Sequence, residues 1–408
     1  MNQVFYQSNV HSVSAKVLLD VSSLTETQLA NILEISHIES VYLDLIANAP
    51  IRINDNQSNV KIDSISVNVS DSFRRTLINS NFDFCISNQV PNNAGKTYFL
   101  PLVNYNDFME LMRLILVHNK QYYLHSNIKV DNFLYLQGRS NYLFPTFQKL
   151  WSFAVSYDAN SLYFDVLDSI ANRFKQLIIA FDECSFYCFE NKGNNSIIYA
   201  IYYFDSFVSQ LASIFGNLAN TINYFYNIND DSRKVDLRVS TNKGKNFLKK
   251  VSEKDPLFGQ KLENADFQNF LNLIIKPLRN DIEHNNIPQG VNSKTMVSMI
   301  LSENTWDLLQ NIIHRYPQEC FFDPNHFDNE VYISIYPVLK FLMIFGRKYI
   351  NYVMREFNIH WKFQDISKVE EESTFNPDQN SMGKECENSL YFTTYWLPIE
   401  SIVNEVVI

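Results

Sequence analysis

Two long stretches of regularly spaced apolar residues constrain the fold of this chain most strongly. In 163–188 and again in 197–225, apolar side chains follow one another at alternating steps of four and three residues. Such steps keep apolar side chains on one stripe of a helix. Gly193 and the two asparagines after it separate the stretches and are typical of a helix end. The pattern therefore predicts an antiparallel helical hairpin. Its two stripes consist of Tyr163, Leu167, Ile170, Phe174, Leu177, Phe181, Cys184 and Cys188, then Ile197, Ile201, Phe204, Val208, Leu211, Phe215, Leu218, Ile222 and Phe225.

The same spacing predicts two further helices, over 264–286 and 329–357. Together with the hairpin they indicate an all-α four-helix bundle spanning 158–363. A basic loop (229–262) and a mixed insertion (287–327) separate the predicted helices. Their apolar faces are Phe267, Leu271, Ile274, Leu278 and Ile282, then Ile335, Val338, Leu342, Phe345, Tyr349 and Val353.

Before the bundle the pattern changes to short β-rich runs alternating with helical ones. Runs 15–23 and 39–47 are typical of strands and flank a helical pattern over 25–36, which is a βαβ-like order. Further strands are expected at 61–69 and 83–87, and a helix at 107–118. We therefore predict an α/β domain of sensing or regulatory role over 1–157.

The predicted fold class is thus α+β multidomain: an α/β domain followed by a helical bundle. The remaining residues, 364–408, are expected to form a polar linker and a C-terminal docking segment. A chain of 408 residues is long enough for this organisation.

Composition excludes several functional classes. The net charge of −10 argues against non-specific nucleic-acid binding by the chain as a whole. The 9 glycines form no GxGxxG loop, and the five cysteines form no CxxC pair. No cofactor or metal site is therefore predicted. Scattered cysteines, the absence of a signal-peptide pattern and the absence of a membrane-spanning apolar run predict a cytoplasmic protein with no membrane contact.

One polar group in the third predicted helix carries recognisable chemistry. The segment IIKPLRNDIEHNN (274–286) places Arg279, Asn280 and His284 within one stretch. A histidine can take or give a proton at neutral pH, and a guanidinium offers fixed charged donors to a phosphate gaining negative charge. Asn280 stands four residues before His284, on the same helical face. These residue types suit proton transfer and the stabilisation of a charged phosphate.

This arrangement resembles the motif of the HEPN superfamily of ribonucleases, in which Arg, a polar residue and His lie on the third helix of a four-helix bundle. The resemblance covers roughly 158–360 and implies a metal-independent endoribonuclease, in which the ribose 2′-hydroxyl attacks the adjacent phosphorus. It also implies a homodimer or higher even oligomer, because two motif helices share one cleft. It also implies a role in antiviral defence, abortive infection or a toxin–antitoxin system, with an antitoxin or a phage-derived trigger as a possible partner. Arg279, Asn280 and His284 are the catalytic residues that the resemblance implies.

Plainer interpretations remain open for this motif. Arg279 and Glu283 could form an i,i+4 surface ion pair, and His284 could favour a helix C-terminus. Pro277 is expected to distort the helix just before the motif. Arg113–His118 and Arg355–His360 share the Arg-x4-His spacing. The first encloses an apolar core sequence, and the second straddles the expected end of the fourth helix.

A basic segment, 232–250, is the candidate RNA contact in an otherwise acidic chain. The alternative is a solvated, flexible loop. The predicted RNA-binding residues are Lys243, Lys245, Lys249 and Lys250.

Weaker candidates are the pair Cys184 and Cys188, which we interpret as core residues before redox or metal ligands, and the aromatic run 202–204, which we interpret as bundle packing. The alternative function for the whole chain is a non-catalytic helical protein that dimerises or scaffolds a larger assembly.

Overall fold

The computed structural model describes residues 13–36, 41–47, 63–64, 84–88, 102–125, 128–147, 150–151, 161–190, 194–228, 231–279, 290–293, 296–313, 324–327 and 330–360. The chain divides into two compact units, with the boundary between Tyr135 and Leu136. Each unit is described by itself.

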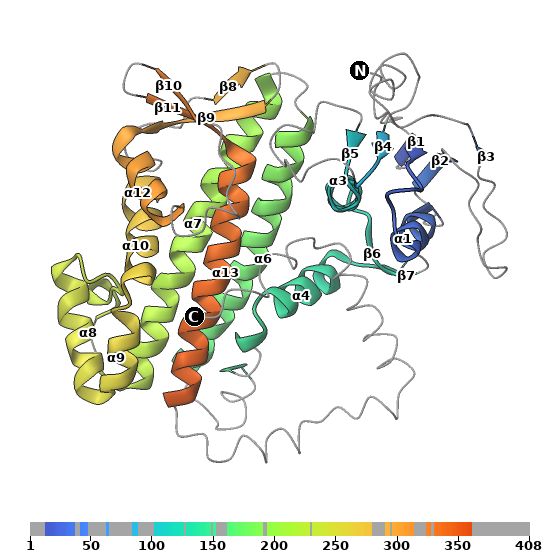
Figure 1. The fold of residues 1–408 in the computed structure, drawn as a ribbon. Helices are drawn as coiled ribbons and strands as arrows, with labels where there is room; N and C mark the ends of the chain where they lie inside the picture. The colour runs from blue at the N-terminus through green and yellow to red at the C-terminus, as the bar shows by residue number, and fades with distance from the viewer. Residues whose placement is uncertain are drawn as a thin grey trace, which may run out of the picture. The chain divides into compact units, whose positions relative to one another are not determined.

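The N-terminal unit contains a five-stranded parallel sheet of order β3-β2-β1-β4-β5. β1 pairs with β2 in parallel, with α1 between them along the chain, so the predicted βαβ unit is confirmed. The elements, seen in Figure 1, are β1 (Val13–Leu19), α1 (Glu26–Ser36), β2 (Val41–Ala47), β3 (Asp63–Ser64), β4 (Phe84–Ile86), β5 (Leu102–Val103), α3 (Tyr105–His118), and the antiparallel pair β6 (Tyr122–His125) and β7 (Ile128–Val130).

β1 is the buried centre of this unit. Val17, Leu18 and Leu19 have no exposed surface, as expected for a parallel strand covered on both faces. The expected helix 107–118 is confirmed as α3, whose apolar run 114–117 is buried. Of the strand expected at 61–69, only the two residues of β3 lie within the described part of the chain.

The C-terminal unit is built on the predicted helical hairpin. α6 (Ser161–Glu190) and α7 (Asn194–Phe225) run side by side, and α13 (Ile335–His360) packs against both (Figure 1). Leu167 to Cys188 along the α6 stripe and Ile197 to Ile222 along the α7 stripe are buried, which confirms the apolar faces. The other helices of the unit are α4 (Asn132–Leu143), which crosses the boundary, η2 (Ser232–Lys234), α8 (Asn242–Lys254), α9 (Pro256–Leu262), α10 (Ala265–Leu273) and α12 (Glu303–Ile313).

An aromatic cluster joins α7, α10 and α13. Phe215 of α7 contacts Phe267 and Phe270 of α10, with ring centroids 6.0 and 6.3 Å apart. Phe270 in turn packs against Phe345 and Tyr349 of α13, at 6.3 and 5.0 Å. These rings are buried, so apolar packing holds α10, the first part of the third predicted helix, in the core of the unit.

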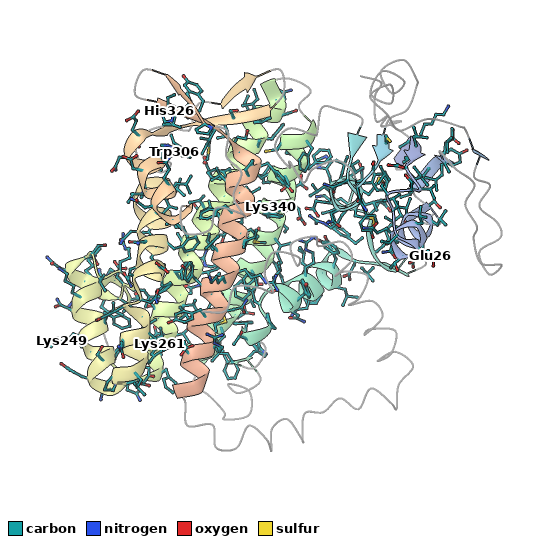
Figure 2. The ribbon with its side chains drawn as sticks, viewed as in Figure 1. Glu26, Lys249, Lys261, Trp306, His326 and Lys340 are labelled. Atoms are coloured by element: carbon teal, nitrogen blue, oxygen red, sulfur yellow. The ribbon has the colours of Figure 1, made fainter. Side chains whose placement is uncertain are left out.

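A small antiparallel sheet lies in the same unit, and it includes residues that were expected to begin the fourth helix. Its order is β10-β11-β9-β8, and α12 follows β9 directly. The expected helix over 329–357 is wrong at its start, because Glu330–Ser334 forms β11 and pairs with β9, and α13 runs on to His360. Trp306 of α12 and His326 of β10 lie near one another, with ring centroids 6.3 Å apart (Figure 2). The strands are β8 (Gly290–Ser293), β9 (Met296–Ser302), β10 (Asn325–Phe327) and β11 (Glu330–Ser334).

Two other expectations about this unit need correction. The predicted basic loop, 229–262, contains the helices α8 and α9, because Phe247, Leu248 and Val251 give α8 an apolar face that is buried. The division predicted at residue 157 differs from the observed one at 135. Asn351 of α13 donates a hydrogen bond to the Leu143 carbonyl (2.8 Å), and Phe144 stacks on Phe174 (3.9 Å), so this segment packs with the helices.

Among the described helices, α7 alone is long and apolar enough to cross a membrane, and half of that stretch is buried inside the fold. Its apolar stripe packs against α6, α10 and α13, which is the burial of a core helix. The predicted tail, 364–408, lies outside the described residues.

Candidate functional site

The described part of the predicted catalytic motif is a π-helical turn. α10 ends at Leu273 and continues as a π-helix, Ile274–Arg279, with Pro277 inside it. Proline has no N–H for the α-helical hydrogen bond, so the expected distortion takes the form of a wider turn. Such turns occur frequently at functional sites. The side chain of Arg279 and all of Asn280 and His284, in the rest of the helix expected over 264–286, lie outside the described residues.

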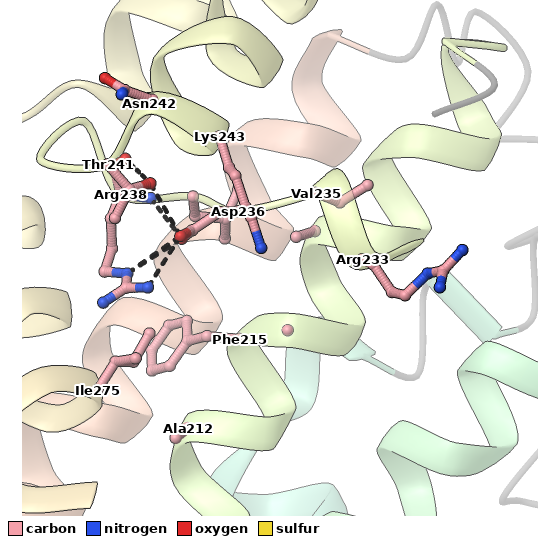
Figure 3. A pocket seen from close by; sticks show the side chains of 13 residues that line it. Ala212, Phe215, Arg233, Val235, Asp236, Arg238, Thr241, Asn242, Lys243 and Ile275 are labelled. Atoms are coloured by element: carbon pink, nitrogen blue, oxygen red, sulfur yellow. Dashed lines mark hydrogen bonds and ion pairs between the residues drawn. The ribbon is translucent and has the colours of Figure 1, made fainter. Parts of the chain in front are cut away.

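A pocket of about 550 Å³ opens beside this turn (Figure 3). One wall is Ile275 of the π-helix, four residues before Arg279. A second wall comes from α7, where small side chains leave the hollow, and a third from the segment that leads into α8. The lining from these two walls is Ala212, Phe215, Gly216 and Ala219, then Arg233, Val235, Asp236, Leu237, Arg238, Thr241, Asn242 and Lys243.

The pocket carries an excess of positive charge. Among the residues that the structure describes, the single carboxylate of the pocket is Asp236. Arg238 engages it, with Nη2 to Oδ2 at 2.9 Å, and so does the Thr241 hydroxyl at 3.0 Å. Lys243 points toward the pocket in Figure 3, and it forms no ion pair with any of the residues that the structure describes. Arg233, the remaining cation, pairs with Asp231 at 2.6 Å. Lys243 is therefore the cation available to an anionic ligand.

Hydrogen bonds fix the pocket wall to α10. The side chain of Gln268 donates to the carbonyls of Leu237 (2.8 Å) and Leu262 (2.7 Å) and accepts from the Val239 amide (2.8 Å). The Ser240 hydroxyl donates to Asn272 (2.6 Å). The helix that leads into the motif therefore also positions the cationic wall.

The start of α8 is packed closely against this wall. Thr241 caps the helix by accepting a hydrogen bond from the Gly244 amide at 2.9 Å. A methyl group at position 244 would lie 1.8 Å from the carbonyl oxygen of Arg238. Only glycine therefore fits here without displacing the backbone that carries Arg238.

Gly244→Ala is expected to lower the free energy of unfolding by about 1–3 kcal/mol, because the added methyl forces the wall away from α8. Chemical denaturation would measure the loss. Gly216→Ala is the matched control, because a methyl at that helical glycine meets nothing within 4 Å. Equal stability of the two variants would contradict the close packing.

The four predicted RNA-binding lysines are all exposed on α8 but do not form one row. Successive helical residues turn by about 100°, so Lys243 and Lys250 project within about 20° of each other. Lys245 and Lys249 project from another side of the helix, and Figure 2 shows Lys249 at the outer edge of α8. Of the four, Lys243 alone lines the pocket.

A half-buried carboxylate in α7 was not anticipated from the sequence. One oxygen of Asp205, Oδ1, is buried and has no hydrogen-bond partner among the residues that the structure describes. Burial raises the pKa of this carboxyl from 3.8 to about 7, because it disfavours the charged form. The only sequence signal was a single acidic residue between apolar ones.

Asp205→Asn is expected to remove a pH-dependent penalty. Because the folded pKa exceeds the unfolded one, the folded state holds its proton more tightly, and stability falls as pH rises from about 4 through 7. The stability difference between variant and wild type should therefore grow in favour of the variant by about 2 kcal/mol between pH 5 and pH 8, a value discounted for partial exposure. Denaturation at both pH values tests this, with the exposed Asp165→Asn on α6 as control. A difference that does not change with pH would contradict the assignment.

The weaker candidates are mostly structural. Cys184 and Cys188 are buried, and burial raises the pKa of the Cys184 thiol, so the interpretation as core residues is confirmed. In the run 202–204, Phe204 is buried but Tyr202 is 63% exposed, so bundle packing explains only part of it. Burial and then the nearby carboxylate of Glu183 raise the pKa of Tyr203, and this acidic surrounding does not suit RNA.

The other two Arg-x4-His spacings also have explanations. Arg113 is buried in α3 and makes two hydrogen bonds to Glu110, at 2.7 and 3.0 Å. Arg355 is exposed and pairs with Glu356 at 3.0 Å. The expectation that the fourth helix ends before His360 is wrong, because α13 includes that residue.

The N-terminal unit contains a polar cluster that the sequence analysis missed. Asp20 follows β1 and is fully buried; its carboxylate accepts hydrogen bonds from Ser22 (2.7 Å) and from Ser87 (2.6 Å), which follows β4. β1 and β4 are adjacent, with β2 and β3 on one side and β5 on the other. The cluster therefore lies at the carboxyl edge where the strand order reverses, the usual ligand position in parallel sheets.

Comparisons of the chain with protein-family models, with curated proteins and with solved structures found no match. Within the described residues, no group of three or more His, Cys, Asp or Glu side chains is arranged to hold a metal ion.

Proposed function

We propose that the helical unit is a HEPN-like endoribonuclease that cleaves RNA without a metal ion. In this proposal His284 moves the proton of the attacking 2′-hydroxyl or of the leaving 5′-oxygen. Arg279 stabilises the negative charge that develops on the phosphate oxygens, and Asn280 orients a phosphate oxygen or the imidazole. Two motif helices meet in a homodimer or higher even oligomer, which acts in the cytoplasm.

One observation carries the proposal: the wall of a cationic pocket continues into the π-helical turn that ends at Arg279. An RNA strand needs positive charge close to its scissile phosphate, and Lys243 supplies it at this wall. The π-helical geometry at the motif adds support, because single π-turns are rare and concentrate at functional sites.

The N-terminal unit is proposed as the regulatory unit of the protein. Its support is the polar cluster around Asp20 at the reversal point of the sheet, where an effector would be bound. In a defence or toxin–antitoxin setting, that effector would be a phage-derived trigger or an antitoxin.

Incubation of the purified protein with mixed RNA in EDTA tests the proposal against the alternative of a non-catalytic scaffold. Cleavage that persists in EDTA supports the enzyme, and light scattering should give a dimer or an even-numbered oligomer. A strict monomer at micromolar concentration would contradict the composite site. RNA left intact, with and without lysate of phage-infected cells to supply a trigger, would favour the scaffold.

A further inference from the structure

The pocket between α7, the 233–243 segment and Ile275 combines two kinds of surface. Its floor is apolar, made by Phe215, Ala212 and Ala219 of α7 together with Ile275. Its rim is cationic, with Lys243 directed inward (Figure 3). A ligand that fits both surfaces has a flat, weakly polar body and an anionic group.

The size of the pocket limits the choice further. About 550 Å³ lies within the range of small-molecule sites and is large enough for one nucleotide. Asp236 is held by Arg238 and Thr241, so its charge is already compensated and does not repel an anion.

We propose that this pocket binds a nucleoside monophosphate unit, with the base over the apolar floor and the phosphate at Lys243. The unit could belong to the RNA strand or to a free nucleotide, since both present the same chemistry. Placement on the RNA strand rests on the proposed function, because Ile275 lies only four residues before Arg279.

Gly216 allows the pocket to be filled without disturbing the fold. It lies on α7 in the pocket wall, and an added Cβ there meets no atom of the described residues within 4 Å. A helical glycine also gains from replacement, because glycine is a poor helix former. Gly216→Met should therefore occupy the hollow and leave the melting temperature unchanged or higher. Gly138→Met is the matched control, since Gly138 is a helical glycine of α4 with equally open surroundings and no part in the pocket.

The experiment measures binding, so that it does not depend on catalysis. Calorimetric titration of the full chain with the four ribonucleoside 5′-monophosphates gives the first arm. The second arm is a short 2′-O-methyl oligoribonucleotide, which has no free 2′-hydroxyl and cannot be cleaved by the proposed chemistry. Binding of both probes can therefore be measured even if the protein cleaves no RNA.

We expect Gly216→Met to weaken binding of both probes at least 10-fold, and Gly138→Met to leave it unchanged. Lys243→Ala should weaken binding of the monophosphates 5- to 10-fold but leave binding of the corresponding nucleosides unchanged. Lys249→Ala, on another side of α8, should leave both affinities unchanged. If the monophosphate and the oligonucleotide compete for the pocket, the bound unit belongs to the RNA strand. If they bind independently, the ligand of the pocket is a free nucleotide. Unchanged affinity in Gly216→Met, or no binding of either probe to wild type, would overturn the proposal.

Discussion

Arg279→Ala and His284→Ala are each expected to lower RNA cleavage by about 10²-fold or more. Removing a charge stabiliser from a transition state costs about 10²–10³ in rate, and removing a general acid–base group costs about 10²–10⁴. Because the two groups act in one step, the double variant should be little worse than either single one. Single-turnover cleavage of a labelled RNA would measure all three.

Arg355→Ala is the matched control for this pair. Arg355 has the same spacing to a histidine, but it is an exposed residue of α13 that pairs with Glu356. Its loss should leave the cleavage rate within a few-fold and cost less than about 1 kcal/mol of stability. If Arg355→Ala reduced cleavage as much as Arg279→Ala while both proteins stayed folded, the assignment of Arg279 as a catalytic residue would be contradicted.

Arg113→Ala is expected to be the most destabilising of these arginine replacements, by about 3–5 kcal/mol. The Arg113 guanidinium is 1% exposed and bonds to both oxygens of Glu110 and to the Tyr135 hydroxyl at 3.1 Å. Its removal leaves the buried Glu110 carboxylate without its main counter-charge. This variant is therefore a poor control for activity, although its sequence spacing matches the motif.

Chemical denaturation should show the loss for Arg113→Ala. Replacing both members, Arg113→Met with Glu110→Leu, should recover much of it, because the uncompensated charge is then gone. A loss below about 1 kcal/mol for Arg113→Ala alone would contradict the assignment of this pair as a buried structural ion pair.

The long helices could be predicted because their signal is local and repeated. The alternating steps in α6 and α7 give each helix one apolar stripe, and β1, α1 and β2 likewise follow their own periodicity. The start of α13 could not be predicted in this way. Glu330–Ser334 is a short apolar-rich run that suits a strand or a helix. Only its pairing with β9 determines that it forms a strand.

The helix within the basic segment, α8, could not be predicted for a different reason. The seven cations of the segment indicate solvent exposure, and they hide the apolar face of α8 formed by Phe247, Leu248 and Val251. The pocket beside it was beyond prediction, because Gly216, Lys243 and Ile275 are far apart in sequence and meet only through tertiary packing.

The chemistry of the RNA ends tests the central claim most directly. Wild-type protein, incubated with a defined RNA in EDTA, should leave 2′,3′-cyclic phosphate and 5′-hydroxyl ends, because the 2′-hydroxyl is the proposed nucleophile. His284→Ala should cleave the same RNA about 10²-fold more slowly or worse. Products with 5′-phosphate and 3′-hydroxyl ends, or equal cleavage by His284→Ala, would contradict the account.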